Sequence, residues 1–218
     1  MADSANTENA EFRRTLLDGA RELGVALDDR AVQRLLCYLN VLLRWNRAFN
    51  LTAIRQPSRI ITEHLLDAIS IAGHVHGERI IDVGTGAGLP GLILAALAPE
   101  RPTVLLDANG KKIRFLREAV RTLDLARVTV HHGRSEDYRP DTAFDTVVCR
   151  AFAPLPRLID VAAHLRSDNG ILLAQKGLYP EDEVAALDDR WRVEHAAVHV
   201  PGLAKTRHVL TLRPGPTP

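Results

Sequence analysis

The chain has 218 residues, of which 46% are hydrophobic and 25% charged, and its formal net charge is +1. This length suits one domain with a substantial core and a small appendage. The balanced charge excludes global electrostatic attraction as the main means of binding nucleic acid, but leaves room for a local basic face. The two cysteines, Cys37 and Cys149, lie far apart, which predicts a reducing compartment and no disulfide framework.

The polar N-terminus has no apolar core, and the longest apolar run, 92–98, is too short to span a bilayer. We therefore expect a cytoplasmic protein without a membrane segment. We also expect a disordered tail over residues 1–9 and a short tail over 214–218.

Helical patterns come first along the chain. Residues 11–23 predict a helix stopped by Gly24, Asp28 predicts the N-cap of a second helix, and 58–72 predict a third. We assign residues 10–76 to an N-terminal helical segment that covers the cleft of the following domain.

Part of this segment is strongly basic, since residues 31–62 contain five arginines and no acid. Interleaved aromatic residues make this composition typical of a surface that meets phosphates and stacked bases. The alternative is that the arginines lie on a solvent-exposed helix face and the aromatic residues belong to the hydrophobic core. For Tyr38 and Trp45 we favour a place in the core. A second basic cluster, on the predicted helix 110–123, is equally compatible with a solvated face. The predicted RNA contacts are Arg44, Arg47, Arg55, Arg59 and, further along the chain, Lys176.

From residue 79 strands and helices alternate, which predicts right-handed βαβ units and a parallel sheet covered on both faces. At the end, 192–200 and 207–213 are two strands with no helix between them, so the last strand runs antiparallel to the rest. We assign residues 77–213 to a doubly wound, Rossmann-like α/β domain with seven strands. The remaining strands are expected near 79–83, 103–106, 127–132, 145–149 and 171–175, and the helices near 89–97, 110–123, 155–165 and 181–188.

The segment 80–91, IIDVGTGAGLPG, predicts a buried strand, a glycine-rich turn and a helix. Gly84, Gly86 and Gly88 allow the backbone to turn sharply and to approach a ligand closely. Asp107 ends the next apolar run, where a carboxylate accepts the hydrogen bonds of a ribose diol. Together these residues predict a site for a nucleoside cofactor.

Two kinds of cofactor fit the loop. Residues 86–91 fit the dinucleotide pattern G-x-G-x-x-G, and residues 84–88 fit the G-x-G-x-G loop of S-adenosylmethionine-dependent methyltransferases. Asp82 favours the second, because a carboxylate there suits the ammonium group of S-adenosyl-L-methionine and would repel a pyrophosphate. A glycine-rich turn without a ligand is a third interpretation.

Other polar residues follow strands at the same edge of the sheet. Ser135 and Glu136 could receive the adenine, although an ordinary Ser-capped turn also explains them. Arg150 and Lys176 could reach cofactor, phosphate or a guanine edge, with an ion pair and a snorkelling surface lysine as their alternatives. Cys149 lacks a Pro-Cys motif and is interpreted as a small buried residue.

Metal binding is not predicted. His131 and His132, like His195 and His199, fall on predicted strands, where the two members of each pair split or misalign across the faces. No N-P-P-Y motif follows the fourth strand, which argues against methylation of an exocyclic adenine nitrogen or a glutamine amide.

Seven groups of motifs follow one another along residues 12–213. In sequence and order they resemble those of the bacterial small-subunit ribosomal RNA guanine-N7 methyltransferases, the RsmG or GidB family. They are NLTA (50–53), EHLLD (63–67), DVGTGAGLPG (82–91), LLD (105–107) with KKIRFL (111–116), RAF (150–152), KG (176–177) and RH (207–208). The resemblance implies a class I methyltransferase fold, S-adenosyl-L-methionine as methyl donor, and guanine-527 of 16S ribosomal RNA as acceptor. It places cofactor contacts on Gly84, Leu89, Ser135, Glu136 and Arg150.

Guanine N7 already carries an in-plane lone pair and no proton, so its methylation requires alignment and exclusion of water but no general base. We assign Asn50, His64, Arg150 and Lys176 as catalytic residues, with Thr52 beside them around the guanine. The expected partner is 16S ribosomal RNA or the small ribosomal subunit, and we expect a monomer. Two alternatives stay open, namely a non-catalytic rRNA-binding assembly factor with a vestigial cofactor pocket and an NAD(P)-dependent oxidoreductase.

Overall fold

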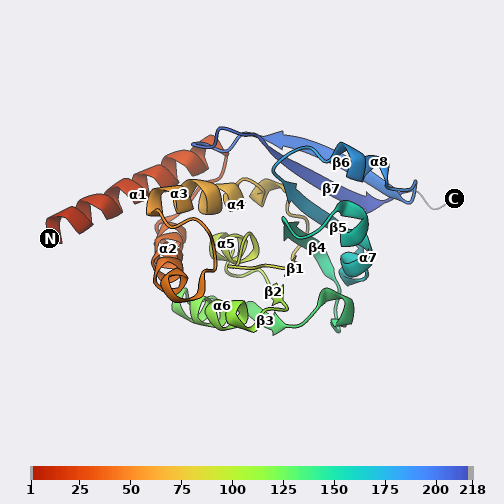
Figure 1. The fold of residues 1–218 in the computed structure, drawn as a ribbon, viewed down its shortest axis with the longest axis horizontal. Helices are drawn as coiled ribbons and strands as arrows, with labels where there is room; N and C mark the ends of the chain where they lie inside the picture. The colour runs from red at the N-terminus through yellow and green to blue at the C-terminus, as the bar shows by residue number, and fades with distance from the viewer. Residues whose placement is uncertain (1, 216–218) are drawn as a thin grey trace.

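A seven-stranded sheet with strand order β3-β2-β1-β4-β5-β7-β6 forms the centre of the protein (Figure 1). The computed structural model describes residues 2–215. β7 pairs antiparallel with both β5 and β6, and the other pairings are parallel, which confirms the predicted doubly wound sheet with one reversed strand. The strands are β1 (Ile80–Val83), β2 (Thr103–Asp107), β3 (Val128–His132), β4 (Phe144–Arg150), β5 (Arg166–Lys176), β6 (Trp191–Val198) and β7 (Arg207–Pro214).

Helices cover both faces of the sheet, because its central strands are apolar on both sides. On one face Val147 and Cys149 of β4 pack against α7, while Val148 between them joins the core of the opposite face, beside α5. The helices of the domain are α5 (Gly91–Leu97), α6 (Gly110–Thr122), α7 (Leu155–Ala162) and α8 (Glu181–Ala185), with 3₁₀ turns η2 (Ala72–His74), η3 (Ser135–Asp137) and η4 (Ala163–Leu165).

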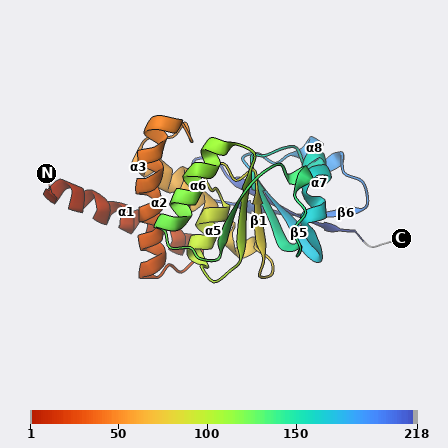
Figure 2. The same ribbon diagram turned by 90° about the horizontal axis from the view of Figure 1, so that it is seen from below.

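The N-terminal helices lie beside α5 and α6, as Figure 2 shows. They are α1 (Ala2–Glu22), α2 (Asp29–Phe49) and one continuous run made of α3 (Pro57–Ile60), the π-helix η1 (Ile61–Leu66) and α4 (Asp67–Ile69). Asp28 caps α2 as predicted, since its carboxylate accepts a hydrogen bond from the backbone N–H of Ala31 at 2.6 Å. None of the described helices is both long and apolar enough to cross a bilayer.

Two boundaries differ from the sequence predictions. Helix α1 begins at Ala2, so the expected disordered tail over residues 1–9 is wrong for residues 2–9, which contain no Gly or Pro to stop the helix. The second tail is shorter than expected, because β7 continues through Pro214. Residues 1 and 216–218 lie outside the described part of the chain.

The N-terminal helices are fixed to the glycine loop by a buried tyrosine. Tyr38 of α2 is fully buried, and its hydroxyl donates a hydrogen bond to the carbonyl oxygen of Ala87 at 2.7 Å. Its ring packs edge-on against Phe115 of α6. The predicted core role of Tyr38 is therefore confirmed, and α2 is held against the loop that follows β1.

Asp82 fixes the same loop from below. The side chain is fully buried at the end of β1, and Oδ2 accepts hydrogen bonds from the Thr85 hydroxyl at 2.6 Å and from the Gly91 N–H at 2.7 Å. A Cβ on Gly91 would lie 2.5 Å from the Cβ of Asp82, so only glycine fits at this first residue of α5. Oδ1 has no hydrogen-bond partner among the described residues, and burial raises the pKa of this carboxyl to about 6.

Replacement of Asp82 with Asn isolates the cost of this buried charge. The folded protein keeps the proton up to about pH 6, whereas an unfolded chain releases it near 3.8. The wild type therefore loses stability relative to Asp82→Asn as pH rises through that window. We expect the free energy of unfolding of the variant minus that of the wild type to increase by up to about 1.4 kcal/mol per pH unit there, measured by denaturant titration.

Asp145→Asn is the matched control of opposite sign. Backbone N–H groups, that of Arg79 foremost, lower the pKa of Asp145. Its ionised form is stabilised by folding, so the asparagine variant should lose stability relative to the wild type as pH rises towards 3.8, and the difference should be flat above that pH. An Asp82→Asn difference that is flat between pH 4 and pH 7, or that falls, contradicts the buried-charge interpretation.

Candidate functional site

A cavity of about 530 Å³ opens at the carboxyl ends of β1 to β4. Such an edge is where doubly wound sheets bind their ligands. The structure brings four of the predicted cofactor residues together there, namely Gly84, Asp107, Ser135 and Glu136. Lys112, Phe152 and Arg157 also line it and were not among the predicted site residues. Lys112 lies in the motif KKIRFL and Phe152 in RAF, which were the available signals, whereas no motif contains Arg157.

Asp107 lies at the floor of this cavity and is nearly buried. Its Oδ2 accepts a hydrogen bond from the Gly86 N–H at 2.9 Å, and its Oδ1 accepts one from the Asn109 N–H at 2.8 Å. Lys112 Nζ lies 3.5 Å from Oδ2. A carboxylate has about four acceptor positions, so each oxygen keeps a position for one hydroxyl of a ribose.

The glycine loop leaves space on the side of Gly86. An added Cβ there would have nothing nearer than Lys112 Nζ at 3.8 Å, whereas at Gly84 it would lie 2.3 Å from the ring of Phe152. Both glycines have φ values above +60°, which side-chain-bearing residues rarely adopt. The open cradle, the orphaned Oδ1 of Asp82 and the free acceptor positions of Asp107 fit a cofactor with a ribose and an ammonium group.

Five predicted cofactor residues lie outside the lining of this cavity, namely Gly86, described above, Arg150, described below, and Asp82, Gly88 and Leu89. Asp82 is beneath the loop, with Oδ2 committed to Thr85 and Gly91. Gly88 accommodates helix packing, since a Cβ would meet that of Leu92 at 2.8 Å, and Leu89 belongs to the hydrophobic core. Their expected direct contacts with a cofactor stay predictions.

Ser135 and Glu136 form the opposite wall, on the 3₁₀ turn η3. The Ser135 hydroxyl donates to Glu136 Oε2 at 3.1 Å, and Arg157 of α7 forms an ion pair with Glu136 Oε1 at 2.6 Å. The side chains of this wall are thus bonded to one another, and the wall combines charged groups with the backbone of Gly133 and Arg134.

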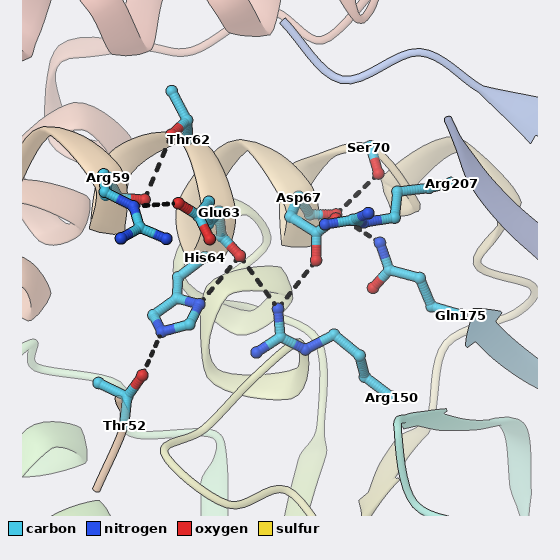
Figure 3. A network of polar contacts seen from close by, with 10 residues as sticks. All are labelled: Thr52, Arg59, Thr62, Glu63, His64, Asp67, Ser70, Arg150, Gln175 and Arg207. Atoms are coloured by element: carbon cyan, nitrogen blue, oxygen red, sulfur yellow. Dashed lines mark hydrogen bonds and ion pairs between the residues drawn. The ribbon is translucent and has the colours of Figure 1, made fainter. Parts of the chain in front are cut away.

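A second cavity, of about 500 Å³, lies at the ends of β4 and β5 under the π-helix. Figure 3 shows the polar network around it. The structure places three of the predicted catalytic residues here, His64, Arg150 and Lys176. Arg150 therefore lines this cavity and not the one that holds Asp107, and its expected contact with the cofactor stays a prediction.

Asp67 is the centre of the network, and the sequence analysis did not single it out. It is 2% exposed; Oδ2 accepts from Arg150 Nη1 at 2.8 Å and Oδ1 from Arg207 Nε at 2.6 Å. The Gln175 side chain donates to the Asp67 carbonyl at 2.8 Å. Asp67 and Arg207 both lie in quoted motifs, HLLD and RH, which were the available signals.

His64 is held as a neutral ring. Its Nδ1–H donates to the Glu63 carbonyl at 2.9 Å, and the Thr52 hydroxyl lies 2.8 Å from Nε2. The Thr52 oxygen also accepts from the Ile54 N–H, and its own proton can point to Nε2 of the neutral ring. Burial, followed by the nearby charge of Arg150, lowers the pKa of His64.

The other predicted residues lie in different surroundings. Lys176 Nζ donates to the Ala153 carbonyl at 2.9 Å and forms an ion pair with Glu183 at 2.8 Å, at the rim of the cavity. Asn50 is outside the lining; it ends α2 with φ at 48°, and its side-chain oxygen accepts from Arg55. Cys149 is buried as interpreted, and burial raises the pKa of its thiol to about 12, which leaves it unreactive.

The predicted basic surface is exposed but partly paired. Arg44 pairs with Glu118 and Arg59 with Glu63, while Arg47 has no ion-pair partner among the described residues. Exposed ion pairs of this kind contribute little free energy, so they hold the two arginine side chains only weakly. Among residues 2–215, no three His, Cys, Asp or Glu side chains form a group suited to a metal ion.

Known proteins resemble the chain over most of its length. The family model GidB, described as rRNA small subunit methyltransferase G, matches residues 31–210. A protein named ribosomal RNA small subunit methyltransferase G from Pseudomonas paraeruginosa is 47% identical over 200 residues, covering 91% of this chain and 94% of the relative. A relative of that name from Idiomarina loihiensis is 40% identical over 198 residues, covering 90% and 95%.

Solved structures show the fold alone, since their identity is low. TrmN from Thermus thermophilus has a TM-score of 0.55 at 20% identity, covering 78% of this chain and 53% of that one. Precorrin-6y C5,15-methyltransferase from Geobacter metallireducens has a TM-score of 0.53 at 16% identity, covering 76% and 92%. With the family model matching residues 31–210, the chain belongs to the GidB family, rRNA small subunit methyltransferase G.

Proposed function

We propose that this protein transfers the methyl group of S-adenosyl-L-methionine to N7 of one guanine, guanine-527, in 16S ribosomal RNA. The observation that carries the proposal is the junction of the two cavities. Ala151 lines both the cavity with Asp107 and the cavity with His64 and Arg150. Donor and acceptor bound on the two sides would meet at the end of β4.

The cofactor cavity has a residue for each part of the donor. Asp107 holds the ribose, Ser135 and Glu136 receive the adenine, and the loop at Gly84 and Gly86 lies against the methionine portion. When bound, S-adenosyl-L-methionine supplies an electrophilic methyl group on a sulfonium centre. The protein has only to align the acceptor nitrogen with that methyl and to exclude water.

The second cavity suits a guanine that has been flipped out of its stack, because a base must leave the helix to enter it. Arg150 uses Nη1 for Asp67, so its other N–H groups can donate to guanine O6. Neutral His64 and the rim residue Lys176 complete the wall. In this proposal the N-terminal helical segment covers the acceptor, and one chain suffices, so the protein acts as a monomer in the cytoplasm.

The test of this function is the modification itself. N7-methylguanine carries a fixed positive charge and becomes cleavable by borohydride followed by aniline. We expect 16S RNA from cells lacking this protein to resist cleavage at one loop guanine, and the restored gene to return it. Restoration by a Gly86→Val variant that no longer binds the cofactor would instead leave the assembly-factor alternative standing.

The cofactor assignment predicts the effect of Asp107→Asn. The amide keeps one acceptor oxygen and loses the charge, so hydrogen bonds to the ribose weaken. We expect the affinity for S-adenosylhomocysteine, measured by calorimetry, to fall about 10- to 100-fold, which corresponds to roughly 1.5–3 kcal/mol. Asp124→Asn, outside both cavities at the end of α6, is the control. Equal affinity of wild type and Asp107→Asn, or binding of NAD in its place, refutes the assignment.

The basic surface predicts a change in salt dependence. Each arginine that neutralises a phosphate contributes about 0.7 to 0.9 to the slope of log affinity against log salt concentration. We expect Arg47→Gln with Arg55→Gln to flatten the slope for small ribosomal subunits by that amount per residue, with cofactor affinity unchanged. Arg190→Gln, on an exposed arginine paired with Asp188, serves as control. Identical slopes would mean that these arginines are solvent-exposed residues of α2 and the following loop that contact no phosphate.

A further inference from the structure

The loop after β5 exposes two large apolar side chains in succession. Leu178 is 72% exposed and Tyr179 is 42% exposed, and they stand among only four large hydrophobic residues exposed in the described part of the chain. Neither belongs to the cavities assigned above. An exposed aromatic ring of this kind is an anchor for a binding partner.

The ring of Tyr179 is held in place from behind. It packs against His195 of β6 with ring centroids 4.7 Å apart and against His208 of β7 at 6.0 Å. The two histidine rings stack on each other, and His195 Nε2 lies 2.9 Å from His208 Nδ1. The two antiparallel strands thus support a fixed aromatic platform at the surface.

Tyr179 lines a third cavity, of about 460 Å³, that is rich in positive charge. Lys176, Lys205 and Arg207 line it together with one carboxylate, that of Glu183. Glu183 is already engaged, since Oε2 accepts from Lys176 Nζ and from the Leu155 N–H. Lys205 is exposed and has no ion-pair partner among residues 2–215.

This third cavity adjoins the proposed acceptor cavity. Lys176, Gly177 and Arg207 line both of them. A polynucleotide that places one base beside His64 and Arg150 therefore continues directly over Gly177 towards Tyr179. A phosphate next to the target lies within the reach of the lysines, and the neighbouring base meets the tyrosine ring.

We propose that the third cavity is a subsite for the nucleotide adjacent to the target guanine, whose base stacks on Tyr179 while Lys205 contacts its phosphate. The inference rests on the proposed function, because the path of the RNA is defined by the guanine in the acceptor cavity. Stacking on an aromatic ring accepts any base, since every base has a π face. The subsite thus adds affinity and positions the target without selecting sequence.

The test compares Tyr179→Leu with Tyr179→Phe, because leucine covers His195 with an apolar side chain but loses both the aromatic face and the hydroxyl, whereas phenylalanine loses the hydroxyl alone. Binding and methylation of small ribosomal subunits from cells lacking the protein are measured, together with calorimetric affinity for S-adenosylhomocysteine. We expect Tyr179→Leu to raise Kd and KM for the subunits about 5- to 150-fold, with kcat at saturation and cofactor affinity unchanged. Tyr179→Phe should stay within about twofold of the wild type.

Lys205→Gln is a second, independent variant, since it leaves the ring platform intact. It should raise Kd and flatten its salt dependence, whereas Arg192→Gln, an exposed cation of β6 outside the cavity, should change neither. One outcome refutes the subsite and leaves the function standing: the wild type methylates subunits, and both Tyr179→Leu and Lys205→Gln bind subunits as tightly as the wild type does. If the wild type binds subunits through Tyr179 but never methylates them, the proposed function fails and the RNA contact stands; no binding by the wild type refutes both.

Discussion

The buried carboxylate of Asp67 is the interaction on which the second cavity depends. It joins the N-terminal helices to two strands, through Arg150 at the end of β4 and Arg207 at the start of β7, while the backbone carbonyl of the same residue accepts from Gln175 near the end of β5. Removing it would leave two guanidinium groups facing each other in a largely buried place, where an uncompensated charge costs about 3–5 kcal/mol. The π-helix before it turns the Glu63 carbonyl to the same side, where that oxygen accepts from both His64 and Arg150. Wider helical turns of this kind occur at functional sites for such reasons.

Buried aspartates therefore define both cavities, by different means. Asp67 is fully bonded and fixes the acceptor side, whereas Asp82 has one bonded oxygen, which anchors the glycine loop, and one orphaned oxygen. Between them the chain leaves β4 through Ala151, whose φ of 49° turns the backbone sharply and lays Phe152 against Gly84. Ala151 at that turn lines both cavities.

Local sequence signals predicted most of the fold and part of the site. The strands, the Asp28 cap, the reversed β7 and the place of Asp107 follow from periodicity and from rules that act over a few residues. The pairing of Asp67 with Arg207 spans 140 positions and exists only after the sheet has formed. Asn50 lies in a motif but ends α2 outside the lining of both cavities, so its catalytic role stays a prediction. Nor does the pattern of a strand tell whether Asp82 faces a ligand or the backbone of the next loop.

The charge of the second cavity fits a reaction in which positive charge moves and no proton is removed. Arg150 and Arg207 share Asp67, and Lys176 is paired with Glu183, so each cation beside the acceptor has a carboxylate in contact. An unpaired cluster of cations would repel both a sulfonium donor and an N7-methylated guanine. This repulsion is stronger where the dielectric constant of the site is lower. In the proposed function these cations keep N–H donors available to guanine and phosphate, while the carboxylates of Asp67 and Glu183 offset part of their positive charge. His64, whose pKa is lowered by burial and by the nearby charge of Arg150, adds a polar edge without a charge. Under the proposed function, the same set of contacts thus serves recognition of an electron-rich base and release of its positively charged product.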